Sequence, residues 1–136
     1  MGLAGVILAA GESTRMGRDK ARIWLAGIRI FNGAGGLLAP KWLAKRVSPE
    51  PEPNPAAIYA FRLFGVRTVK IGADLLSGDA GVREHAARAA PGIHLSDTAT
   101  AAMLLLRGQV TKRAGIMLTA ISALNTFLAF KARPPE

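Results

Sequence analysis

This chain of 136 residues contains no cysteine, so neither a disulfide framework nor a thiolate metal site can form. Histidine is also scarce, and His85 and His94 cannot build a metal site by themselves. We expect each of them to be solvated or to cap a helix. Aromatic residues are only 6% of the chain, and basic residues stand singly or in pairs between apolar runs. This pattern argues against a nucleic-acid partner, which would need aromatic platforms beside a basic tract.

Positive charge and apolar residues are both abundant. The formal net charge is +9, half of the residues are hydrophobic, and glycine occurs 15 times. Such a charge suits an anionic partner, either lipid headgroups or nucleotide phosphates. Small residues in apolar helices favour close helix packing in lipid. The length fits one domain with a core of its own.

The segment 56–76, AAIYAFRLFGVRTVKIGADLL, is apolar over about the 20 residues that cross a bilayer. It nevertheless carries Arg62, Arg67, Lys70 and Asp74. Because Lys70 comes four residues before Asp74, the two side chains can form a local ion pair on one helix face. Unpaired charges in an apolar surround are costly, so the rest of the chain must supply partners for the arginines.

Three more apolar segments of similar length predict further helices. The proline-rich linker 45–55 separates the first predicted helix from the second, and a polar connection, 77–91, precedes the third. Trp24 and Trp42 lie toward the two ends of the first segment, as interfacial anchors would. The sequence thus predicts an all-α fold, a four-helix integral membrane bundle over residues 21–136 with helices at about 21–44, 56–76, 92–110 and 114–132. A soluble helical bundle within a larger assembly is a weaker alternative.

Polar residues inside these segments predict a buried network. Asp97 either sits near a helix start as a charge favoured by the helix dipole, or pairs across helices with Arg62 or Arg29. Such a network is a candidate site for a proton or a small polar ligand, and a purely stabilising role is an equal alternative. Its predicted members are Arg29, Asn32, Arg62, Arg67, Asp74, Asp97 and Asn125.

Residues 1–20 predict a different structure. A short aliphatic run breaks at Gly11 and passes into a basic segment, which is typical of a buried strand followed by a glycine turn. At such a turn Ala10 and Gly11 would let a nucleotide approach backbone N–H groups, and Arg15 and Lys20 would neutralise its phosphates.

The sequence LAAGESTRMGRDK, within residues 7–20, resembles the signature that opens nucleotidyltransferases of the molybdenum-cofactor guanylyl- and cytidylyltransferase type. The resemblance implies binding of a nucleoside triphosphate with Mg²⁺ and transfer of a nucleotidyl group. It ends at about Lys20, and no later aspartate follows a strand-like run to hold the Mg²⁺. The residues that would bind the nucleotide are Leu8, Ala9, Ala10, Gly11, Arg15, Gly17 and Lys20.

Residues 23–136 resemble small actinobacterial-type membrane proteins with four predicted spans and no assigned activity, the DUF4267-type group. This resemblance rests on the order of segments and implies no catalytic residues. We therefore expect a multi-pass protein of the cell membrane, with the lipid bilayer as its partner, no cofactor, and self-association left open. The alternative is a cytoplasmic nucleotidyltransferase or a truncated fragment of one, in which case residues 1–20 bind nucleotide. Otherwise we expect them to be a fused remnant of such a gene or an error of gene modelling.

Overall fold

The computed structural model describes residues 3–48, 50, 52 and 54–135, with the side chains of residues 3–13 outside the description. Within this part of the chain there are five α-helices and no strand, so the all-α class is confirmed. The predicted number of helices, four, differs because a short helix follows the first long one. The helices are α1 (Leu3–Leu38), α2 (Pro40–Val47), α3 (Pro55–Leu75), α4 (Ala80–Leu106) and α5 (Lys112–Ala132).

Helix α1 replaces the strand and turn that were predicted before residue 21. The backbone of residues 3–20 is helical and continuous with residues 21–38. Most residues there are good helix formers, and a glycine inside a helix costs only about 1 kcal/mol relative to alanine, which is too little to end so long a helix. The helix ends at Leu38, because the residue before a proline is pushed out of helical geometry and Pro40 then opens α2.

The starts of α3, α4 and α5 are each capped by a side chain. The Asn54 side chain accepts a hydrogen bond from the Ala56 amide at 2.8 Å. Asp79 caps α4 in the same way. Because of that cap, α4 already begins at Ala80, and most of the segment 77–91 is helical instead of a surface connection.

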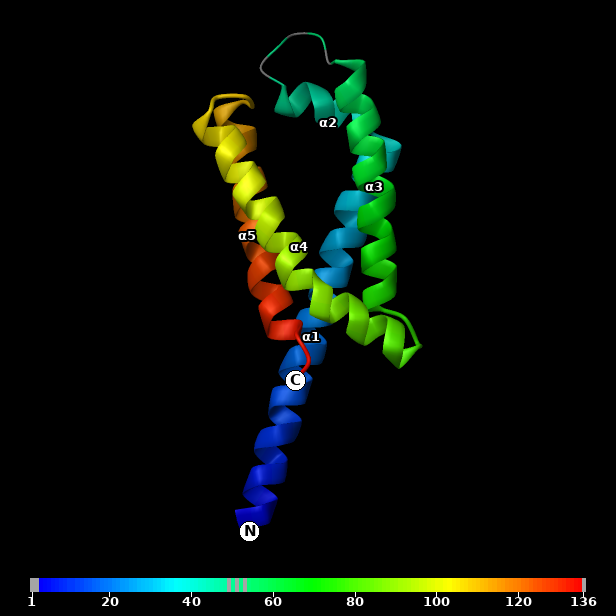
Figure 1. The fold of residues 1–136 in the computed structure, drawn as a ribbon, viewed down its shortest axis with the longest axis vertical. Helices are drawn as coiled ribbons and strands as arrows, with labels where there is room; N and C mark the ends of the chain where they lie inside the picture. The colour runs from blue at the N-terminus through cyan, green and yellow to red at the C-terminus, as the bar shows by residue number, and fades with distance from the viewer. Residues whose placement is uncertain (1–2, 49, 51, 53, 136) are drawn as a thin grey trace.

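Pro91 lies inside α4 and is buried. A proline in a helix interior removes one backbone hydrogen bond and kinks the helix. In Figure 1 the first part of α4 crosses the lower end of the bundle and its later part runs along α5.

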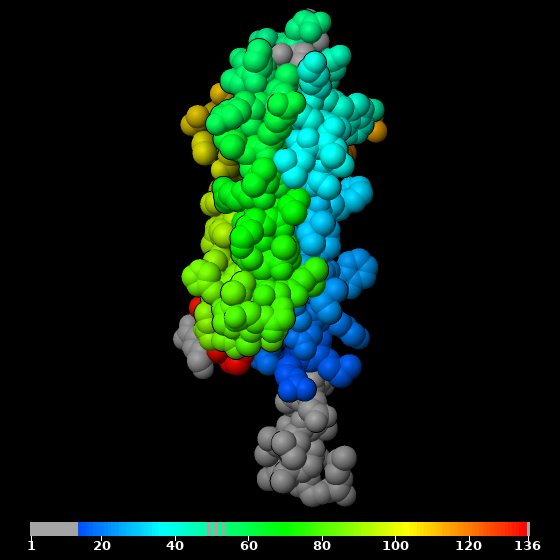
Figure 2. Space-filling view, turned by 90° about the vertical axis from the view of Figure 1, so that its right-hand side faces the viewer, coloured from blue at the N-terminus to red at the C-terminus, as the bar shows by residue number. Residues whose placement is uncertain are grey.

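The long helices form two antiparallel pairs, α1 with α3 and α4 with α5 (Figure 1). The pairs meet in the lower half of the view and diverge toward the upper end. Figure 2 shows α3 lying along α1 over most of its length. Glycines make this approach possible: a methyl group added to Gly65 would lie 2.7 Å from the Gly33 carbonyl oxygen, and one added to Gly72 would lie 2.6 Å from Ile30 Cγ1.

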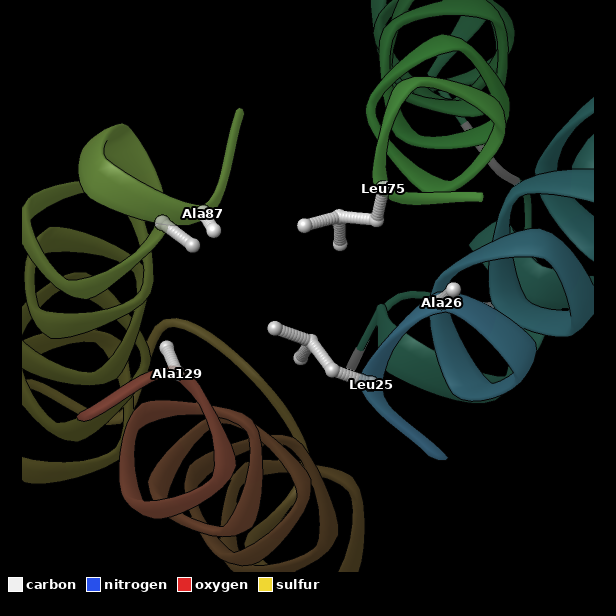
Figure 3. Close-up of a cluster of buried hydrophobic side chains, with 6 residues drawn as sticks. Leu25, Ala26, Leu75, Ala87 and Ala129 are labelled. Atoms are coloured by element: carbon white, nitrogen blue, oxygen red, sulfur yellow. The ribbon is translucent and has the colours of Figure 1, made fainter. Parts of the chain in front are cut away.

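The apolar core cluster lies where the two pairs meet. In Figure 3 Leu25 and Leu75 point into the space between the pairs, with Ala87 and Ala129 facing them from α4 and α5. The residues of this cluster are mostly alanines, so the core is thin. Its members are Leu25, Ala26, Leu75, Ala87, Ala90 and Ala129.

Helix α5 is the one helix, among the described residues, that is long and apolar enough to cross a membrane by length and composition. Its mean hydropathy reaches 1.4 over the most apolar window, and only 17% of that window is buried inside the protein. A core helix of a soluble protein would be mostly buried. The other predicted spans, in α1, α3 and α4, do not meet this criterion in the described part of the chain.

Candidate functional site

Each of the four long helices contributes one buried polar side chain close to the apolar core cluster. All four are at most 4% exposed. No two of them come from the same helix, so the folded bundle alone brings them together. They are Arg29 on α1, Thr68 on α3, His94 on α4 and Asn125 on α5.

These residues lie within about two helical turns of the core cluster, on the same side of it, and we call this part of the bundle the polar level. Arg29 follows Leu25 of the core cluster by four residues, and Asn125 precedes Ala129 by four residues. Because α1 and α5 run in opposite directions, both lie one helical turn beyond the core cluster on the same side of it (Figure 1). The same reasoning places His94 one turn, and Thr68 about two turns, beyond the cluster.

The centre of this level is an ion pair between α1 and α4. Arg29 Nη1 donates a hydrogen bond to Asp97 Oδ2 at 3.3 Å, and it lies 3.3 Å from His94 Nδ1. His94 Nδ1 is 3.9 Å from the same carboxylate oxygen. A guanidinium can only donate, so His94 Nδ1 accepts, and in the neutral ring the proton is assigned to Nε2. We call Arg29, His94 and Asp97 the polar cluster.

Four buried polar atoms at this level have no hydrogen-bond partner among the described residues. Such atoms are rare in native proteins and usually mark a bound water, ion or ligand. Arg29 Nε and His94 Nε2 are donors, Thr68 Oγ1 is both donor and acceptor, and Asn125 Oδ1 is an acceptor. Each of these atoms could bond to a buried water or to a polar group of a ligand.

Arg67 adds positive charge at the edge of the cluster. Its side chain is exposed, yet it acts electrostatically on both Arg29 and His94. The positive charges of Arg29 and Arg67 therefore outnumber the single carboxylate of the cluster, that of Asp97. Asp74 does not compensate for this, because it pairs with Lys70 on its own helix.

The structure brings together fewer of the predicted network residues than the sequence indicates. The Arg29–Asp97 pair is present, Asn125 is buried nearby, and Lys70 pairs with Asp74 as its spacing predicts. Arg62 is exposed and Asn32 is half-buried, and neither side chain forms a hydrogen bond with another described residue. The choice between Arg62 and Arg29 as the partner of Asp97 is thus settled by geometry in favour of Arg29.

His94 is the member that sequence reasoning missed. It was expected to be solvated or to cap a helix, but it is 0% exposed and lies inside α4. That expectation was wrong because the helix start was placed at residue 92 and lies at Ala80 instead. The signal for its role was its spacing: His94 precedes Asp97 by three residues, which puts both on one helix face.

The predicted nucleotide-binding residues do not form a phosphate-binding loop. Leu8, Ala9, Ala10 and Gly11 lie in the part of α1 whose side chains are outside the description. The backbone there is helical, and amides inside a helix are already bonded to carbonyls of the preceding turn, so they are not free to cradle a phosphate. Arg15, Gly17 and Lys20 are exposed.

The chemistry available at the polar cluster is binding, by hydrogen bonds and charge. Among the described residues no group of three histidine, aspartate or glutamate side chains could hold a metal ion. The cluster has one carboxylate and one imidazole beside a guanidinium, which suits recognition of a polar group or transfer of a proton. Comparison with models of protein families, with characterised proteins and with solved structures finds no match to this chain. The two resemblances in the sequence therefore stay predictions.

Proposed function

We propose that this protein is a multi-pass membrane protein whose helices hold a small polar ligand or water at the polar cluster. The observation that carries the proposal is an inverted distribution of side chains. Apart from Leu25 and Leu75, the described interior consists mostly of alanine, glycine and polar residues, whereas bulky apolar side chains cover the outside of the helices. Examples are Trp24 at 67%, Phe31 at 79% and Leu106 at 85% exposed.

The exposed area supports a lipid environment as well. The chain of 14.3 kDa exposes 8870 Å², whereas a folded protein of this mass is expected to expose about 6,800 Å². Exposed apolar residues occur on α1, α3, α4 and α5, so one partner docked on a single face could not cover them all. A bilayer surrounds all four helices at once and removes this surface from water.

The way the helices pack fits the same proposal. Helices α1 and α3 approach closely through glycines, as helices do where lipid provides no hydrophobic drive for association. Trp24 and Trp42 are both exposed, near opposite ends of the first predicted span. The charged ends of Arg62 and Lys70 are exposed on long flexible stems, which can extend toward the bilayer surface.

The polar cluster is then the site, within the described residues, where a polar molecule would be stabilised inside the bilayer. Intramembrane ionisable residues are costly and usually serve a ligand or proton path. Arg29 and Asp97 neutralise each other, which lowers that cost, and the four unpartnered atoms remain for a ligand. The nucleotidyltransferase alternative has less support, because it needs a strand and turn where the described backbone of α1 is helical.

Single-cysteine labelling tests the membrane placement, since the chain has no cysteine of its own. Glu50→Cys and Gln109→Cys lie in the connections α2–α3 and α4–α5, and Gly78→Cys lies in the turn α3–α4. In sealed vesicles a membrane-impermeant maleimide should label the first two from one side and Gly78→Cys only from the other. The slight excess of Lys and Arg near the termini favours the cytoplasmic side for Gly78. Recovery of the protein without membranes, or labelling of all three from one side, contradicts the proposal.

A further inference from the structure

A basic cavity of about 290 Å³ lies at the end of the bundle opposite the α4–α5 connection. Its walls are α1, the first turns of α4 and the chain segment after α5. Four arginines and two carboxylates line it, which leaves a positive excess of two charges in the described lining. The charged lining residues are Arg15, Arg18, Asp19, Arg22, Arg83 and Glu84.

Two of the arginines are held in place by backbone carbonyls, one at the end of α3 and one in the turn after it. Arg22 Nη1 donates to the Leu75 carbonyl oxygen at the end of α3, and Arg83 Nη1 donates to the Ser77 carbonyl oxygen at 2.8 Å. Each guanidinium has five N–H donors, so most of them stay available after one bond. Arg22 also has a weak contact with Asp19, 3.8 Å between Nη2 and Oδ1. The cavity thus has two positioned cationic groups before any ligand enters.

The other two arginines have no partner among the residues that the structure describes. Arg15 and Arg18 make no hydrogen bond or ion pair within the described residues, and together with Arg22 they are spaced three and four residues apart on one face of α1. Like charges this close repel one another unless an anion lies between them. Guanidinium groups bind phosphate oxygens in a two-pronged geometry, which makes phosphate the best-matched anion.

The position of the cavity favours a lipid as the source of that phosphate. Ile23 and Trp24, which directly follow Arg22, are exposed apolar residues, so the cavity lies at the edge of the apolar surface. No aromatic side chain is among its described lining residues, so a nucleotide base would have nothing to stack on. We propose that this cavity binds the phosphate of an anionic lipid headgroup, which rests on the proposed membrane location.

A lipid titration with a matched pair of variants tests the inference. The full-length protein, purified in detergent, is titrated with phosphatidylglycerol, with phosphatidylcholine of the same chain length and with ATP, and native mass spectrometry reports the bound fraction. Arg15→Gln/Arg18→Gln removes the two arginines that have no partner among the described residues and spares the two that are bonded to backbone carbonyls. Arg107→Gln/Arg113→Gln removes the same charge at the opposite end of the bundle, where both side chains are exposed.

We expect the wild-type protein to prefer phosphatidylglycerol and Arg15→Gln/Arg18→Gln to bind it about thirtyfold more weakly. The control variant should bind like the wild type, and circular dichroism should show equal helix content in all three. Equal binding of the two lipids, an equal loss in the control variant, or ATP binding that depends on Arg15 and Arg18 overturns the inference. Membrane topology is read separately by cysteine labelling, so a correctly inserted protein without lipid preference refutes the lipid site alone.

Discussion

Arg29 Nη1 on α1 lies 3.3 Å from Asp97 Oδ2 on α4, and this ion pair joins two helices that pack mainly against other partners. Helix α1 packs against α3 and α5, and α4 packs against α5. The Arg29 side chain is 4% exposed and that of Asp97 is 31% exposed. This ion pair therefore links α1 and α3 to α4 and α5. Removing the Asp97 carboxylate would leave the buried Arg29 guanidinium without its ion-pair partner.

Asp97→Asn should destabilise the fold. Breaking a fully buried ion pair costs several kcal/mol, and the partial exposure of Asp97 reduces the expected loss to about 1–2 kcal/mol. The measurement is the free energy of unfolding in detergent by denaturant titration. Asp19→Asn is the matched control, because its contact with Arg22 spans 3.8 Å and its side chain is 57% exposed. The double variant Arg29→Gln/Asp97→Asn should recover part of the loss, and a wild-type stability for Asp97→Asn would refute the linking role.

Gly65→Ala should force α1 and α3 apart. The new methyl group would lie 2.7 Å from the Gly33 carbonyl oxygen and 2.8 Å from the Leu37 amide nitrogen, and neither backbone atom can move without shifting the helix. We expect a loss of about 1–3 kcal/mol in the free energy of unfolding. Gly27→Ala is the control, since nothing lies within 4 Å of its added methyl group, and higher helix propensity should stabilise it by about 0.5–1 kcal/mol. Equal stability of the two variants would rule out close packing at this crossing.

Local signals along the chain identify α3 well, whereas the start of α4 was predicted twelve residues too late, at position 92. Asn54 followed by Pro55 marks the start of α3, and the four-residue spacing of Lys70 and Asp74 predicts their ion pair. These features depend on neighbours along the chain. Asp97 was predicted either to sit near a helix start as a charge favoured by the helix dipole, or to pair with Arg62 or Arg29. The choice between these roles needed the rotation of each helix, which depends on packing.

The N-terminal helix and the burial of His94 could not be predicted either, because both depend on more of the chain than a short window of sequence. The residues before position 21 match a strand-and-turn pattern over a short window, whereas the whole 36-residue helix α1 outweighs the cost of its glycines. The start of α4 at Ala80 depends on the Asp79 cap, which the sequence analysis assigned to a polar connection. Once that start is known, the position of His94 inside the helix follows from its spacing to Asp97.

Thr68→Val tests whether the unpartnered atoms near the polar cluster bind a water or a ligand. Thr68 is 1% exposed and its Oγ1 has no partner among the described residues. If a water or ligand forms a hydrogen bond with Thr68 Oγ1, losing the hydroxyl should cost about 1 kcal/mol in the free energy of unfolding. An empty site would make valine neutral or stabilising. Thr100→Val is the control, because Thr100 is exposed and bonds only to the Ser96 carbonyl; its change should stay within about 0.5 kcal/mol.

Asn125→Cys should react with a small neutral thiol reagent, methyl methanethiosulfonate, although Asn125 is 4% exposed. The reacting species is the thiolate, which forms only where water or another polar group stabilises its charge. Asn125 Oδ1 has no partner among the described residues, so water reaching this level would hydrate a thiol there. Ala129→Cys is the matched control, one turn away on the same helix and 0% exposed in the apolar core cluster. Labelling at 125 with protection at 129, followed by mass spectrometry of the intact protein, supports a hydrated site. Equal protection at both positions would mean that the cluster is dry, and would leave the Arg29–Asp97 pair with a stabilising role only.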